Sequence, residues 1–163
     1  MIKEWKKKSS KYLLENKIFK LREDIVESPK LETEHKVWAM EVPTWVNIIP
    51  ITSLGEVILV NQYRFGMEKF SLEIPGGMSD IGEDPMLAAT RELKEETGYV
   101  GKKVLEIGRV ESNPAIMSNH TYTYLALDCE KISDQSLDGT EDIEIVKKNI
   151  CLLYTSPSPR DLY

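Results

Sequence analysis

Three glutamates lie close together in a stretch of the sequence that is typical of a helix. Glu92, Glu95 and Glu96 fall on one stripe of such a helix at about 100° per residue, with Glu92 and Glu96 one turn apart. Like charges at that spacing destabilise a helix by roughly 0.2–0.5 kcal/mol. The stripe is therefore either a solvated face, which is the commoner case for a lone Glu-x-x-Glu-Glu, or one side of a cation site.

The residues around this stripe favour the cation site. Gly76 and Gly77 allow the backbone to approach a ligand closely and can offer a carbonyl oxygen to a metal. Carboxylate and carbonyl oxygens are hard ligands that suit Mg²⁺ or Mn²⁺, and these ions in turn suit phosphate chemistry. Arg91 lies between the helix faces, where it is better placed to hold Glu83 or a neighbouring carboxylate than to contact a substrate.

The helix that carries the glutamates is predicted over residues 85–97. Asp84 can cap its N-terminus, Pro85 suits its first position, and Gly98 suits the position just after its end. The side chains expected to face the core recur at helical spacing; they are Met86, Ala89, Thr90, Leu93 and Thr97.

Runs of β-branched residues predict a mixed sheet around this helix, and hence an α/β (α+β) layered fold. The expected strands are 45–51, 57–60, 104–110, 121–128 and 142–146, the first two forming a buried hairpin. Residues 2–15 are expected to form a short amphipathic surface helix, whose mixture of Lys and Glu argues against membrane binding. Residues 17–42 are expected to form a hairpin or a small sheet.

The composition sets limits on the class of protein. A chain of 163 residues with 41% apolar content fits one globular domain, and it contains no apolar run of the roughly 20 residues that span a bilayer. A net charge of −6 argues against a broad basic face for nucleic acid. Cys129 and Cys151 have no Cys-x-x-Cys spacing, so neither a zinc site nor a disulfide framework is expected. The N-terminus has no secretory signal, so a cytoplasmic location is expected.

The segment from Gly77 to Tyr99 resembles the Nudix box, Gly-x5-Glu-x7-Arg-Glu-(aliphatic)-x-Glu-Glu-x-Gly-(hydrophobic), at every fixed position. Nine defined positions over 23 residues are far more specific than a lone Gly-x-Gly-x-x-Gly. The resemblance covers about residues 17–149. Three flanking pieces are similar to the ADP-ribose and nucleotide-sugar pyrophosphatase branch: Asn-Gln-Tyr-Arg at 61–64, Leu-Glu-Ile-Pro-Gly-Gly at 72–77, and Asn-Pro-Ala at 113–115.

This resemblance implies a fold and a set of metal-binding residues. The implied fold is the Nudix α/β/α sandwich with a mixed β-sheet and an N-terminal β segment that builds a homodimer in this branch. Glu92 and Glu96 are implied to be metal ligands, with Glu95 and the Gly76 carbonyl as further contributors. The remaining box positions are implied to be structural or orienting; they are Gly77, Glu83, Arg91 and Gly98.

The substrate-binding residues implied by the resemblance lie outside the box. Arg64 is similar to an arginine that contacts the diphosphate, and its alternative is an ordinary arginine at a strand edge. Trp45 either stacks on a base or belongs to the core. Glu73 and Pro114 complete the implied substrate-binding set.

The implied catalytic base lies in a late loop, residues 138–144. Glu141 aligns best with an acidic position of that loop, but Gly139 stands where related enzymes often have a second carboxylate. The base is thus Glu141, Asp142 or one of the box glutamates, with Glu95 the next candidate. His120 is more often a structural or substrate-contacting group in such a setting.

The implied reaction is Mg²⁺-dependent hydrolysis of the diphosphate bond of ADP-ribose or a nucleotide sugar, giving a nucleoside monophosphate and a sugar phosphate. The alternatives are a housecleaning hydrolase of oxidised nucleotides and a non-catalytic Nudix-fold nucleotide sensor. No nucleic-acid or membrane partner is expected.

The expected domain organisation has three parts. Residues 1–42 are an N-terminal helix and β segment of dimerisation type, and residues 43–150 are a C-terminally truncated Nudix hydrolase domain. Residues 151–163, CLLYTSPSPRDLY, resemble a translated sequencing adapter and are expected to be non-native.

Overall fold

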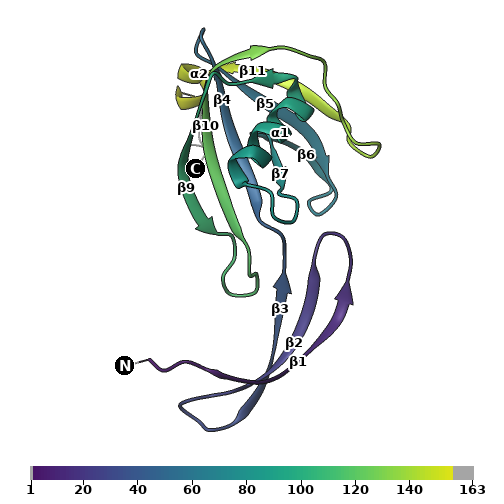
Figure 1. Cartoon of the computed structure of the whole chain (residues 1–163), viewed down its shortest axis with the longest axis vertical. Coiled ribbons are helices and arrows are strands. Elements are labelled where there is room, and N and C mark those ends of the chain that lie inside the picture. Colours follow the sequence, from purple (N-terminus) through teal and green to yellow (C-terminus); the bar gives the residue numbers. More distant parts are fainter. Residues whose placement is uncertain (1, 156–163) are drawn as a thin grey trace. The chain divides into compact units, whose positions relative to one another are not determined.

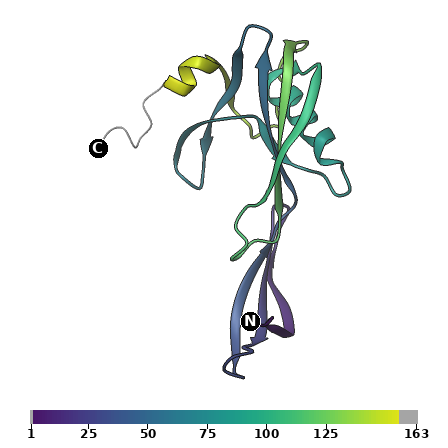
Figure 2. The same cartoon turned by 90° about the vertical axis from the view of Figure 1, so that its left-hand side faces the viewer.

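The computed structural model describes residues 2–155, which divide into two compact units. One unit comprises residues 2–44 and 110–121, and the other comprises residues 45–109 and 122–155. Figures 1 and 2 show the course of the chain through both units. No helix of the described residues is long and apolar enough to cross a membrane.

The first unit is built on an antiparallel sheet of three strands. In the order in which they pair, these are β1 (Lys6–Glu15), β2 (Lys20–Glu27) and β3 (Glu34–Glu41). The predicted hairpin within 17–42 is confirmed as β2 and β3. The predicted helix over residues 2–15 is wrong, because residues 6–15 form β1. Pairing along β2 supplies hydrogen-bond partners that outweigh the weak helical pattern, and Ser9 and Ser10 are poor helix formers.

The second unit is built on a larger sheet, whose path runs β11-β5-β4-β10-β8. Strand β6 pairs with β5, β7 with β4, and β9 with β10. The strand bounds are β4 (Trp45–Thr52), β5 (Glu56–Arg64), β6 (Lys69–Glu73), β7 (Gly76–Met78), β8 (Tyr99–Val100), β9 (Lys103–Glu111), β10 (His120–Lys131) and β11 (Ile143–Asn149). All five predicted strands are confirmed, each somewhat longer than predicted. Strands β6 and β7 were not predicted, and they carry Glu73 and the Gly76-Gly77 pair to the sheet.

Helix α1 (Pro85–Thr97) has the bounds that the local sequence predicts. The Asp84 carboxylate accepts hydrogen bonds from the backbone N–H groups of Met86 and Leu87, at 2.9 and 3.3 Å. At the other end, Gly98 adopts a left-handed φ of 74° and donates its N–H to the Lys94 carbonyl. These caps satisfy groups that a helix end leaves without intrahelical partners.

The buried face of α1 differs from the predicted one. Met86 is exposed and Thr90 only half-buried, whereas Ala88, which was not predicted to face the core, is fully buried together with Glu96. The two adjacent alanines are small enough for α1 to pack closely on β4 and β7. That packing turns the helix so that Glu96, and not Met86, points inward. The core around it consists of Val46, Ile48, Ile58, Ala88, Ala89, Leu93, Tyr99, Tyr124, Ala126 and Cys129.

A six-residue helix, α2 (Ile150–Thr155), follows β11 directly. The interpretation of residues 151–163 as non-native stays a prediction. Residues 156–163 of this tail lie outside the described residues.

We expect Gly98→Ala to lower the free energy of unfolding by at least about 2 kcal/mol. A left-handed backbone costs an alanine roughly 1–2 kcal/mol, and its Cβ would lie 2.1 Å from the Ser133 carbonyl oxygen. Gly108→Ala is the matched control, because nothing lies within 4 Å of a Cβ there, and it should change stability by only about 0.5 kcal/mol. Urea denaturation measures both; equal effects would contradict this account of the helix end.

Candidate active site

Glu96 is the most deeply buried carboxylate of the box segment, with 4% of its surface exposed. Its Oε2 accepts a hydrogen bond of 3.0 Å from the Gly76 N–H. Burial raises the pKa of Glu96 to about 8, and the negative charges of Glu92 and Glu141 act in the same direction. The Gly76 N–H and the positive charge of Arg64 oppose that rise but do not cancel it. The site thus favours a proton or a cation at this carboxylate.

The two glycines of β7, Gly76 and Gly77, let this strand lie close to β4 and to α1 because they have no side chain. β7 pairs with β4, with Gly76 opposite Asn47 and Gly77 opposite Val46. A Cβ on Gly77 would lie 2.6 Å from the Glu92 carboxylate carbon, and one on Gly76 would lie 2.2 Å from the Val46 carbonyl oxygen. The absence of side chains here lets the strand pack against both its neighbour and the Glu92 carboxylate.

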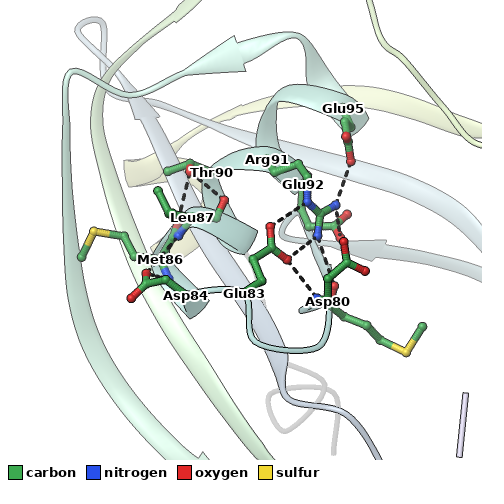
Figure 3. Close-up of polar contacts among 10 residues, drawn as sticks. Asp80, Glu83, Asp84, Met86, Leu87, Thr90, Arg91, Glu92 and Glu95 are labelled. Atoms are coloured by element: carbon green, nitrogen blue, oxygen red, sulfur yellow. Dashed lines mark hydrogen bonds and ion pairs between the residues drawn. The ribbon is translucent and has the colours of Figure 1, made fainter.

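Arg91 connects the loop before α1 to the glutamates on it (Figure 3). Its Nε and Nη2 donate to the two Glu83 carboxylate oxygens, both at 3.0 Å. Its Nη1 donates to Glu92 and to Glu95, both at 2.9 Å. The bond to Glu83 does most to raise the pKa of Arg91, and it keeps the pKa of Glu83 below its usual range. The Arg91–Glu83 pairing that the sequence indicated is present, and any effect of it on a metal stays a prediction.

Within residues 2–155, no three His, Cys, Asp or Glu side chains converge closely enough to form a ready metal-binding group. Glu92 and Glu95 contact Arg91, whereas Glu96 contacts Gly76. The donor set nevertheless fits a hard divalent cation, because carboxylate oxygens and a backbone carbonyl are the ligands such an ion prefers. Burial also raises the pKa of Glu92. Burial thus disfavours the ionised form of the Glu92 and Glu96 carboxylates, although Glu92 is also paired with Arg91.

Arg64 and Glu73, both predicted to bind substrate, pair with each other. They lie on the neighbouring strands β5 and β6, and Arg64 donates to Glu73 from Nε at 3.0 Å and from Nη2 at 2.6 Å. The charges of Glu96 and Glu141 contribute to the raised pKa of Arg64. The structure therefore places Arg64 in the electrostatic reach of the carboxylates, with Glu73 holding its guanidinium.

Glu141 lies in an exposed turn of the 137–142 loop. Its backbone N–H donates to the Asp138 carbonyl, and its carboxylate accepts from the Asp138 N–H, both at 2.9 Å. Its negative charge contributes to the raised pKa values of Glu92 and Glu96. The structure thus brings Glu141 near the box glutamates, although more than 40 residues separate them in the sequence.

Trp45, Pro114 and His120 make no hydrogen bond or ion pair with these carboxylates among the described residues. Trp45 begins β4 and is 37% exposed, so it is not a core residue. Pro114 and His120 belong to the other unit, in a segment where the Ile116 carbonyl accepts a hydrogen bond from the Met40 N–H. Their relation to substrate stays a prediction.

One residue of this region was not predicted from the sequence. Gln135 donates from Nε2 to the backbone carbonyl oxygens of Glu96, at 2.7 Å, and of Ile143, at 3.1 Å. These partners are 39 and 8 residues away, and a glutamine in a polar loop carries no local signal of such contacts.

A cavity of about 500 Å³ lies on another side of α1, between the helix and the loop at Ser133 and Ser136. Arg91 and Glu95 line it, but Glu92, Glu96 and Arg64 do not. The carboxylate cluster, and not this cavity, is therefore the candidate active site.

Residues 43–150 match the NUDIX domain, and the chain belongs to this family. It is 33% identical to the ADP-ribose pyrophosphatase of Bacillus subtilis over 106 residues, which are 64% of this chain and 57% of that protein. It is 31% identical to the methanol dehydrogenase activator of Bacillus methanolicus over 136 residues, 83% of this chain and 73% of that protein. The chain thus spans little more than half of the first relative's length.

The fold is shared with a solved structure described as an ADP compounds hydrolase. The TM-score is 0.80 at 23% sequence identity, covering 99% of this chain and 90% of the other. The predicted Nudix fold, of α+β class with a mixed sheet, is thereby confirmed.

We expect the metal-free protein to lose stability as the pH rises from about 4.5 to about 8. A carboxyl group with a raised pKa binds its proton more tightly in the folded than in the unfolded chain. Glu96 therefore stabilises the fold below its ordinary pKa of 4.5, and this stabilisation is lost as the pH rises through about 8. Melting temperatures measured with a chelator across this range report the loss.

Glu96→Gln is neutral at every pH and should flatten this dependence. Glu106→Gln, at an exposed position of β9, is the control and should leave the dependence as in the wild type. A Glu96→Gln profile parallel to that of the wild type would show that the burial of Glu96 does not cause the effect.

Proposed function

We propose that this chain hydrolyses the diphosphate bond of ADP-ribose or a nucleotide sugar, in a Mg²⁺-dependent reaction that releases a nucleoside monophosphate and a sugar phosphate. The observation that carries the proposal is the buried Glu96 carboxylate against the Gly76 N–H, with Glu92 one turn away on the same helix. Relatives named ADP-ribose pyrophosphatase and ADP compounds hydrolase support the substrate class.

The carboxylates would hold the cation. Glu92 and Glu96 are its proposed ligands, with Glu95 and the Gly76 carbonyl as contributors, and Mn²⁺ is the alternative ion. When bound, the ion supplies charge neutralisation for the diphosphate and acidifies a water molecule. Two raised pKa values support this assignment, because a divalent cation stabilises the ionised form that burial disfavours.

The remaining steps fall to the chain's own side chains. Arg64, which pairs with Glu73, would bind diphosphate oxygens through its guanidinium. Glu141 is the proposed base, which takes a proton from the attacking water, with Asp142 and Glu95 the alternatives. Arg91, which Glu83 holds, donates hydrogen bonds to the Glu92 and Glu95 carboxylates and would fix their orientation.

A substrate panel tests the reaction. ADP-ribose, ADP-glucose, GDP-mannose, diadenosine polyphosphates and an 8-oxo nucleotide are incubated with Mg²⁺, and the products are identified. Turnover of ADP-ribose or a nucleotide sugar to a monophosphate and a sugar phosphate is the expected result. Preference for the 8-oxo nucleotide would indicate the housecleaning alternative, and binding without turnover would indicate the nucleotide sensor.

Glu96→Gln should lower kcat at least about 100-fold, because it removes a charge that a hard cation requires. Mg²⁺ should also raise the melting temperature of the wild type at about pH 8 but not that of Glu96→Gln. Glu106→Gln should behave as the wild type in both assays. Near-normal turnover of Glu96→Gln at saturating Mg²⁺ would contradict the metal assignment.

We propose further that the chain forms a homodimer through its N-terminal sheet. Leu14 and Trp38 share one face of that sheet with Leu21 and Met40, and each of the first two is about half exposed, at 50% and 52%. Three strands alone do not cover such a face, and a second copy would bury it.

A cytoplasmic location is also proposed, since Cys129 is a buried thiol and not half of a disulfide.

Trp38→Lys should shift the protein from dimer to monomer in sedimentation velocity, because it places a charge in the face to be buried. Leu54→Lys is the control, at an apolar residue of the second unit that is 78% exposed, and should leave the mass unchanged. A wild-type monomer, or a dimer that withstands Trp38→Lys, would refute this interface.

A further inference from the structure

The C-terminal end of α1 is capped by a segment that lies more than 30 residues further along the chain. The backbone N–H groups of Ile132 and Ser133 donate to the Gly98 carbonyl, at 2.9 and 3.3 Å. The Ser136 N–H donates to the Glu95 carbonyl at 2.8 Å. Carbonyls in the last turn of a helix have no intrahelical partner, so segment 132–136 supplies their donors.

Gln135 provides the contact to the Glu96 carbonyl, and it does so with a side chain. Its Nε2 donates there at 2.7 Å and to the Ile143 carbonyl at 3.1 Å. Ile143 is the first residue of β11 and directly follows the loop 137–142. One amide group therefore contacts both the helical turn that carries Glu95 and Glu96 and the end of the loop that carries Glu141.

The loop between Gln135 and Ile143 is held by few hydrogen bonds of its own among the described residues. Its 138–141 turn is closed by the two hydrogen bonds between Asp138 and Glu141, and both residues are exposed. The position of Glu141 relative to α1 thus depends on where the loop is anchored. Gln135 is half-buried before the loop, and its side chain is hydrogen-bonded to Ile143 directly after the loop.

We propose that Gln135 is a positioning residue. It holds the 137–142 loop, and with it Glu141, in a fixed position relative to the turn of α1 from Glu92 to Glu96. This inference rests on the proposed function, in which Glu141 acts on the attacking water. The chemistry of the site requires a glutamine, since both partners are carbonyl oxygens and need two N–H donors on one nitrogen. A glutamate would instead place a carboxylate oxygen against two carbonyl oxygens, and an asparagine is one methylene shorter.

Gln135→Met tests the proposal, because it keeps the length of the side chain and removes the donors. Hydrogen exchange of the amides at 137–143 should become about fivefold faster. The kcat for ADP-ribose should fall about 10- to 100-fold with KM changed by about twofold or less, since a small misplacement of a reacting group is costly. Gln135→Glu should give the same loss, so the test does not depend on one variant.

Ser136→Ala is the matched control, since it retains the backbone N–H that bonds Glu95 and should leave exchange and kcat unchanged. A double-mutant cycle separates positioning from a general structural role. If Gln135 acts through Glu141, then Gln135→Met in a Glu141→Gln background should cause no further loss of kcat.

Unchanged exchange of the loop in Gln135→Met would overturn the proposal, and so would additive losses in the cycle. Faster exchange with a non-additive cycle would support it. If the wild type turns over none of the panel substrates, the proposed function fails, and the exchange measurement still decides whether Gln135 anchors the loop.

Discussion

The burial of Glu96 is the constraint on which the candidate site depends. α1 approaches β4 and β7 closely because its inner face carries Ala88 and Ala89, and because the strand facing it carries Gly76 and Gly77. This approach removes the Glu96 carboxylate from water and leaves it against one backbone N–H. A buried, unpaired charge destabilises a fold, and an apolar side chain there would be less costly. The proposed cation would offset this cost by stabilising the ionised form of Glu96.

The carboxylates of the box are divided by their surroundings into two kinds. Glu83 contacts Arg91 through both oxygens, and its pKa is lowered, so it stays ionised and fixes the guanidinium. Glu92 and Glu96 are more deeply buried, and their pKa values are raised. Groups of one chemical type with pKa values shifted in opposite directions are typical of a functional site. Here the division separates an orienting carboxylate from the proposed ligands.

The helix that bears these groups is held at both ends by different means. Its N-terminus is capped locally by Asp84, whereas its C-terminal carbonyls are satisfied by Gly98 and by the distant segment 132–136. The second arrangement links the box to the late loop, because Gln135 contacts both. The structure thus links the helical turn of the proposed ligands to the end of the loop of the proposed base, through hydrogen bonds from one side chain to two backbone carbonyls.

The sequence by itself determined the features that rest on local chemistry. The bounds of α1 follow from Asp84, Pro85 and Gly98, because caps act within a few residues, and the spacing of the glutamates defines their stripe on any helix. Tertiary structure decided the features that depend on partners far along the chain. Residues 6–15 form a strand because β2 pairs with them, and α1 turns Glu96 inward because of what it packs against. Gln135 gained its place in the site only when the fold brought two distant carbonyls within reach of one amide, and no local pattern encodes that distance.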